Sequence, residues 1–172
     1  MCISVGIFSG LAVVASRQLI HSFSRTGLGL SGHKAFLWMT PLLIARFRTG
    51  AKIGATAGSM FAAMTAYSLG SNFAGGLIGF PMIGVAAAIL DGAADFIEKR
   101  KLSGFSIIFI LAFAGVAANL VCFNKRLLNP SGHANGSLIA DLFLYMLFGM
   151  ISGVVAAVTV KTISRLKGEC KE

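Results

Sequence analysis

Charged side chains are scarce in this sequence, and acidic ones are the scarcest. Only 12% of the 172 residues are charged, and the 6 Asp and Glu residues are outnumbered by 15 Lys and Arg. An average soluble domain carries about 25% charged residues. With 56% hydrophobic residues and a mean hydropathy of +0.82, the composition excludes an ordinary soluble domain. We therefore predict a single integral membrane domain covering residues 1–172.

Motifs for nucleotide binding and hydrolysis are missing as well. The chain has no Gly-x4-Gly-Lys-Ser/Thr phosphate loop, no Gly-x-Ser-x-Gly nucleophile turn and no ordered Ser, His and Asp set. The sequence thus predicts no ATPase of its own, no cofactor and no enzyme activity. The net charge of +9 would suit nucleic acid, but the cations cluster between apolar runs, which is typical of membrane topology signals. We expect no nucleic-acid partner.

Six apolar runs organise the chain. A membrane-crossing helix needs about 20 residues for ~30 Å of hydrocarbon, so the second run must begin near Leu28 to cross, with Pro41 kinking it. The first run follows Met1 without the positively charged start of a signal peptide, so we expect it to be retained. The predicted fold is an all-α, polytopic bundle of about six transmembrane helices, with spans at 3–20, 28–47, 50–70, 73–95, 104–123 and 138–160.

Small residues recur at every fourth position in several of these spans. A helix places residues i and i+4 on one face, and helices in lipid associate through such small faces. In a soluble helix each glycine would instead cost roughly 0.5–1 kcal/mol relative to alanine. A second small face, Gly84, Ala88 and Gly92, lies in the fourth span. The residues that we predict to serve helix packing or partner docking are Gly6, Gly10, Gly50, Gly54 and Gly58.

Positive charges predict the orientation. If the N-terminus lies inside, ten Lys and Arg fall on the inner side and five on the outer side. The positive-inside rule then places both termini in the cytoplasm of a multi-pass cell-membrane protein.

An acidic group lies at the inner end of the fourth span, where Asp91, Asp95 and Glu98 share one face. Residues 91–95 resemble part of the aspartate motif of membrane CDP-alcohol phosphotransferases, whose further aspartates and Ala-Arg pair are absent here. Paired carboxylates would suit Mg²⁺ and a phosphate, or a small membrane enzyme. The favoured alternative is ion pairing with nearby cations, namely Arg46, Arg48 or Lys52.

Polar, basic and aromatic residues gather on the predicted outer side. Asn119 lies about one turn below the outer end of its helix, where an amide is not expected to face lipid, so we predict that it points into the bundle. A binding pocket for a small polar solute is predicted from Arg17, His33, Lys34, Trp38, Tyr67, Asn119 and Asp141. We predict no metal site; the alternative is a site formed by His21, His33 and His133, which lack a tight ligand spacing.

The architecture resembles the substrate-binding S component of an energy-coupling factor (ECF) transporter. Residues 31–38 and 41–46 are similar to the first outer loop and second helix of uncharacterised members, and residues 118–120 are similar to part of their fifth helix. The resemblance implies capture of a vitamin-like solute or metal from outside, and docking onto a transmembrane T component driven by two cytoplasmic ATPase subunits. It also implies docking through small residues of the first helix, where this chain has Gly6 and Gly10 in place of Ala-x-x-x-Ala.

The outer charges predict an anionic solute. Five cations and three histidines lie there with only one acid, Asp141. A cation that is partly shielded from water and has no partner carries a desolvation penalty, which a bound counter-charge offsets. A carboxylate or phosphate would bind Arg17 or Lys34. Two alternatives remain open. In the first, the cations contact membrane lipid headgroups instead of a solute. In the second, the protein is a membrane enzyme or structural scaffold with Asp91 and Asp95 as its polar site.

Overall fold

The structure is a computed structural model that describes residues 1–24, 34–70, 79–102, 104–128 and 138–169, with side chains over 1–16, 36–70, 79–102, 104–124 and 138–162. Over these residues the chain forms six α-helices and no strand, so the all-α prediction is confirmed. The helices are α1 (Cys2–Ser24), α2 (Lys34–Thr49), α3 (Gly54–Ser68), α4 (Gly79–Lys99), α5 (Phe105–Leu128) and α6 (Leu138–Glu169).

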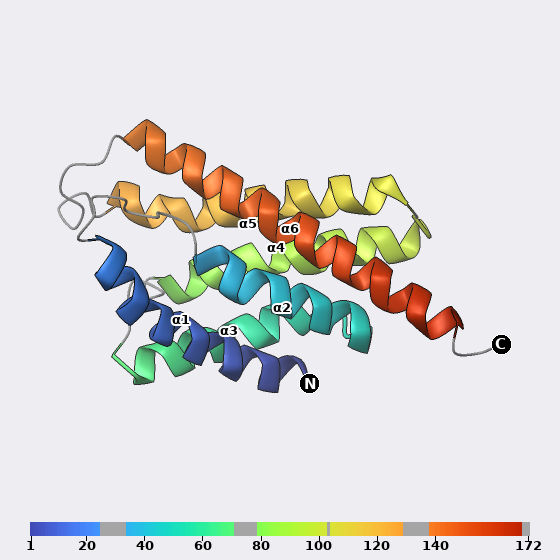
Figure 1. Cartoon of the computed structure of the whole chain (residues 1–172), viewed down its shortest axis with the longest axis horizontal. Helices are drawn as coiled ribbons and strands as arrows, with labels where there is room; N and C mark the ends of the chain where they lie inside the picture. The colour runs from blue at the N-terminus through green and yellow to red at the C-terminus, as the bar shows by residue number, and fades with distance from the viewer. Residues whose placement is uncertain (25–33, 71–78, 103, 129–137, 170–172) are drawn as a thin grey trace.

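Successive helices run in opposite directions (Figure 1). The N-terminus, the α2–α3 turn, the α4–α5 turn and the end of α6 lie at one end of the bundle, on the right of the view. Exposed cations mark this end: Arg48, Lys52, Lys99, Arg100 and Lys101. We call it the basic end. At the opposite end α1, α3 and α5 finish, and α2, α4 and α6 begin.

Three of the described helices are long and apolar enough to cross a membrane. They are Gly79–Lys99, Phe105–Asn124 within α5 and Leu138–Thr162 within α6. At about 1.5 Å per residue, the 16 residues of α2 and the 15 of α3 fall short of the ~30 Å of hydrocarbon. These lengths support a membrane protein, while six crossings stay a prediction.

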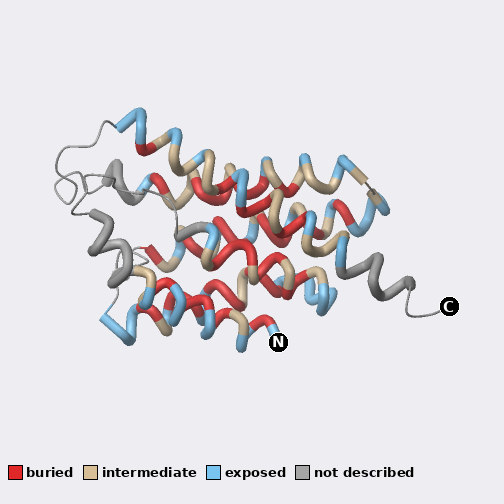
Figure 2. The backbone as a smooth tube through the Cα atoms, viewed as in Figure 1, coloured by how far each residue is buried: buried red, intermediate tan, exposed pale blue. Residues whose placement is uncertain are grey.

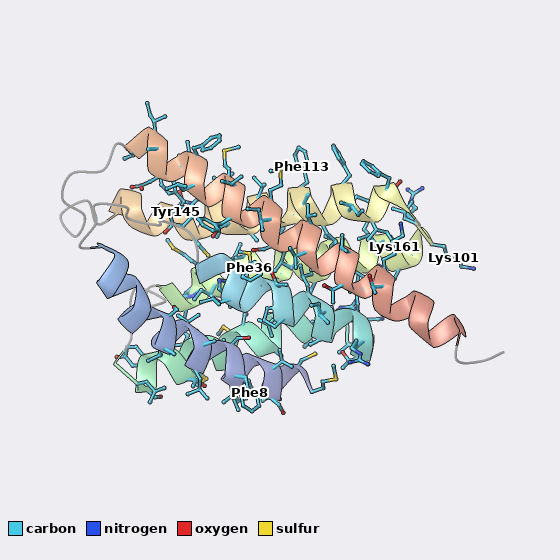
Figure 3. All side chains as sticks on the ribbon, viewed as in Figure 1. Phe8, Phe36, Lys101, Phe113, Tyr145 and Lys161 are labelled. Atoms are coloured by element: carbon cyan, nitrogen blue, oxygen red, sulfur yellow. The ribbon has the colours of Figure 1, made fainter. Side chains whose placement is uncertain are left out.

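Large apolar side chains cover much of the outer surface. Phe105 is 81% exposed, Ile139 76% and Phe8 71%. Figure 3 shows such side chains pointing away from the bundle, with Phe8 and Phe113 labelled. An exposed apolar surface of this kind is expected where lipid, and not water, surrounds the helices.

The core lies around α2. Its side chains Trp38, Met39, Leu42 and Leu43 are almost fully buried, and α2 packs against α1, α3, α4 and α6. The buried residues accordingly gather in the middle of the bundle in Figure 2. This short helix is therefore surrounded by protein along its middle turns.

Two pairs of helices meet through glycine. A Cβ on Gly6 would collide with the Gly58 carbonyl oxygen, and one on Gly10 would lie 2.6 Å from the Ala62 oxygen, so α1 and α3 touch backbone to backbone. Between α5 and α6, Gly115 faces Gly149 in the same way, and a Cβ on Gly153 would collide with the Leu111 carbonyl oxygen. Close backbone approach of this kind is how helices associate in lipid.

Gly6, Gly10, Gly54 and Gly58 thus lie at contacts within the chain, while docking of a partner on them stays a prediction. A Cβ on Gly54 would stand 3.0 Å from the Cys2 sulfur. Gly50 does not pack against another helix of the described chain. Gly50 follows α2 with φ +65°, its N–H donates to the Arg46 carbonyl at 2.9 Å, and a Cβ there would meet nothing within 4 Å. It ends α2 in the left-handed conformation that glycine adopts most readily.

The predicted small face of α4 is also not a packing face within the described chain. Ala88 and Gly92 are exposed. A Cβ on Gly92 would meet nothing within 4 Å, and one on Gly84 would meet only the Met60 sulfur at 3.7 Å. The four-residue step is present, but no helix covers it because α4 turns its Ala86, Leu90 and Asp91 side inward.

Gly6→Ala and Gly92→Ala form a matched pair for testing this packing. Gly6→Ala should lower the unfolding temperature of the purified protein in detergent, since separating two touching backbones costs about 1–3 kcal/mol. Gly92→Ala should leave it unchanged or raise it, because alanine at an open helical position is favoured by up to ~1 kcal/mol. Circular dichroism during heating measures both. Equal shifts for the two variants would contradict the α1–α3 contact.

Thiol labelling tests the membrane topology. Lys101→Cys should react with a membrane-impermeant maleimide only after cells are opened, because the basic end is expected to face the cytoplasm. Ser131→Cys, between α5 and α6, should react in intact cells. Labelling of both positions from the same side would contradict a crossing by α5.

Candidate functional site

A fully buried arginine lies at the basic end, in the last turn of α2. The Arg46 side chain is 0% exposed, and a buried cation is costly unless it is paired. Its Nε lies 3.5 Å from Asp91 Oδ1, and its two terminal nitrogens bind Glu98 Oε1 and Oε2 at 3.0 and 3.1 Å. Asp95 Oδ1 forms a further ion pair with Nη2. Three carboxylates from one face of α4 thus surround a single guanidinium.

Asp91 also binds the start of α3. Its Oδ1 accepts the Ala55 N–H at 3.0 Å, while Oδ2 accepts the Thr56 N–H at 2.8 Å and the Thr56 hydroxyl at 2.7 Å. The first N–H groups of a helix have no partner within the helix, and the N-cap residue of α3, Ile53, makes no side-chain hydrogen bond. The Asp91 carboxylate, which belongs to α4, therefore accepts the hydrogen bonds that an N-cap residue of α3 would normally accept. It lies next to the positive end of the α3 dipole.

These contacts confirm that the acidic group pairs with a nearby cation, and they identify the cation as Arg46. Arg48 and Lys52, the other two candidates, are exposed. Both oxygens of Asp91 already accept hydrogen bonds from α3, which favours a structural role over a catalytic or Mg²⁺-binding one. No group of three or more His, Cys, Asp or Glu residues suited to a metal occurs among the described side chains.

A second polar contact joins α5 and α6 in the opposite half of the bundle. Asn119 is 2% exposed, and its Nδ2 donates to the Tyr145 carbonyl oxygen at 2.6 Å. The Tyr145 ring, labelled in Figure 3, meets Phe123 edge to face with centroids 5.2 Å apart. The prediction that Asn119 points into the bundle is confirmed.

The other residues predicted to bind a solute lie on different helices and differ in how far they are buried. Asp141 is buried in the first turn of α6, one turn before Tyr145, and Trp38 is buried in the core around α2. Tyr67 is 51% exposed and packs edge to face on Phe80 of α4, with ring centroids 5.9 Å apart. Arg17 and His21 lie in α1, and Lys34 begins α2, but their side chains lie outside the described residues, as do His33 and His133 entirely.

Sequence reasoning missed two participants in these contacts. Thr56 was not predicted, although the lack of any Ser, Asp or Asn immediately before α3 indicates that its first N–H groups need an outside acceptor. Gly115, which faces Gly149, was also missed because the residues four positions to either side of it, Leu111 and Asn119, are not small, so no four-residue repeat marks it.

Arg46→Gln and Arg48→Gln test how much the buried pair contributes. Arg46→Gln should destabilise the protein by about 3–5 kcal/mol, because it leaves carboxylates near the bundle interior without their cation. Arg48→Gln, two residues away and exposed, should change stability by less than about 0.5 kcal/mol. Unfolding in detergent measures both. A small effect of Arg46→Gln would contradict a stabilising role for the ion pairs.

Among the described side chains, buried charged or amide groups thus occur in two places: Arg46 and Asp91 near the basic end, and Asn119 and Asp141 in α5 and α6. Ion pairs and hydrogen bonds join the first set. Comparison of the chain with protein-family models, with curated proteins and with solved structures gives no match.

Proposed function

We propose that this protein is a solute-capturing membrane subunit of an uptake transporter, which binds a small, vitamin-like anion from the outer side and is energised by separate ATPase subunits. One observation carries the proposal: an amide and a carboxylate, Asn119 and Asp141, are buried where α5 and α6 meet, in the half of the bundle away from the basic end. Polar side chains inside a membrane bundle are costly, and they commonly mark the path or binding site of a solute.

The charges of neighbouring residues suit an anionic solute. Arg17, late in α1, and Lys34, at the start of α2, bring two cations to this half of the bundle. A guanidinium binds a carboxylate or phosphate with two parallel hydrogen bonds, and an ammonium binds it as a point charge. Stacking on the ring of Trp38 would require the core around α2 to open, because that ring is buried. The amide of Asn119 offers both donor and acceptor. Asp141 would pair with one of the cations or accept a hydrogen bond from the solute.

We propose an external energy source, since the chain carries no phosphate-binding loop. A transmembrane T component and cytoplasmic ATPases are therefore the proposed partners. Gly6 and Gly10 are covered by α3 in this structure. A T component would have to contact another surface of the bundle, or α1 would have to separate from α3.

Recovery of the bound solute tests the proposal. Protein purified from membranes should release a small anion that mass spectrometry identifies. Arg17→Gln and Lys34→Gln should each lower its retention about tenfold or more, since hydrogen bonds to charged groups contribute ~1.5–3 kcal/mol. Arg48→Gln, at the basic end, is the matched control and should retain the anion fully. Recovery of a cation or metal, or full retention by both test variants, would contradict the assignment.

A further inference from the structure

An open apolar groove of about 440 Å³ runs along the first turns of α5, beside the α4–α5 turn. Two large rings border it and are turned outward: Phe105 is 81% exposed and Phe109 is 62% exposed. The residues that line the groove are Leu102, Phe105, Ser106, Phe109 and Ile110.

Three consecutive cations stand directly before this groove in the chain. Lys99, Arg100 and Lys101 are all exposed. The Arg100 guanidinium lies 5.7 Å from the centre of the Phe96 ring, close enough for a cation–π contact. The nearest carboxylate in the sequence, Glu98, is already bound by Arg46 and so is not available as the sole partner of these cations. The turn therefore presents a concentrated positive charge.

The backbone of the turn holds the cations next to the groove. Lys101 N–H donates to the Glu98 carbonyl at 3.2 Å, and Leu102 N–H donates to the Ile97 carbonyl at 3.1 Å. This pair of bonds is a Schellman motif, which usually has glycine where Lys101 stands with φ 49°. A lysine thus occupies a position where glycine would fit with less strain, immediately before the first wall of the groove.

We infer that this site binds an anionic phospholipid, with its phosphate at the cations of the α4–α5 turn and one acyl chain along the groove of α5. A phosphodiester supplies the counter-charge that the cations need, and an acyl chain suits a groove bordered by two phenylalanines. The proposal depends on the bundle lying in a membrane. It does not depend on the transport function, so either can fail without the other.

Site-directed tryptophan fluorescence tests the site. Phe109→Trp places a fluorescent reporter in the groove. The native Trp38 is 2% exposed, and the wild-type protein gives its fluorescence as the background. In phosphatidylcholine vesicles, brominated phosphatidylglycerol should quench the reporter with an apparent affinity about fivefold or more above that of brominated phosphatidylcholine, which is roughly the effect of one headgroup-bound cation. Phe105→Trp is a second reporter, for use if the first variant does not fold.

Charge variants in the reporter background separate a local site from the general charge of the basic end. Lys99→Gln with Arg100→Gln should reduce the preference for phosphatidylglycerol to near unity. Lys101→Gly should lower it as well while keeping or raising the unfolding temperature, because glycine suits the positive φ. Arg48→Gln with Lys52→Gln removes the same charge from the α2–α3 turn and should leave the preference unchanged. Equal quenching by the two lipids, or an equal loss in the control pair, would overturn the inference.

Discussion

The buried charge of Arg46 is the constraint on which the arrangement of α2, α3 and α4 depends. A guanidinium without water around it needs its counter-charges within contact distance, and here they come from positions 91, 95 and 98 of one helix. Only one rotation of α4 brings all three to the last turn of α2. Because Asp91 in the same set also binds α3, a single cation sets the register of three helices.

The rest of the bundle depends on backbone contact more than on large side chains. Lipid is as apolar as leucine, so burying a leucine between two helices in a membrane gains little. Glycine instead allows α1 to touch α3, and α5 to touch α6, while α2 fills the space between these pairs with Trp38 and its neighbours. Specific polar contacts, such as Asn119 with the Tyr145 carbonyl, then align the helices along their axes.

Much of the fold could be predicted from the sequence, but less of the site. Apolar runs mark where helices form, and the depth of Asn119 in its run is enough to predict that it points inward. A four-residue step predicts which residues share a face, but not which helix covers it, so α4 was assigned a packing face that is open at Gly92. The start of α3 depends on Asp91, some 35 residues away, which no local pattern reveals. The residues proposed to bind a solute are the least predictable, because Arg17, Asn119 and Asp141 lie in three different helices that no local pattern links.

The capping of α3 by Asp91 has a consequence for biosynthesis. The ribosome completes α3 before it reaches the carboxylate that satisfies the first N–H groups of that helix. Until α4 is made, the Ala55 and Thr56 N–H groups lack the acceptor that they have in the folded chain. The first turn of α3 is therefore expected to become stable only when α4 packs beside it, so that the two helices form as a hairpin and not one after the other.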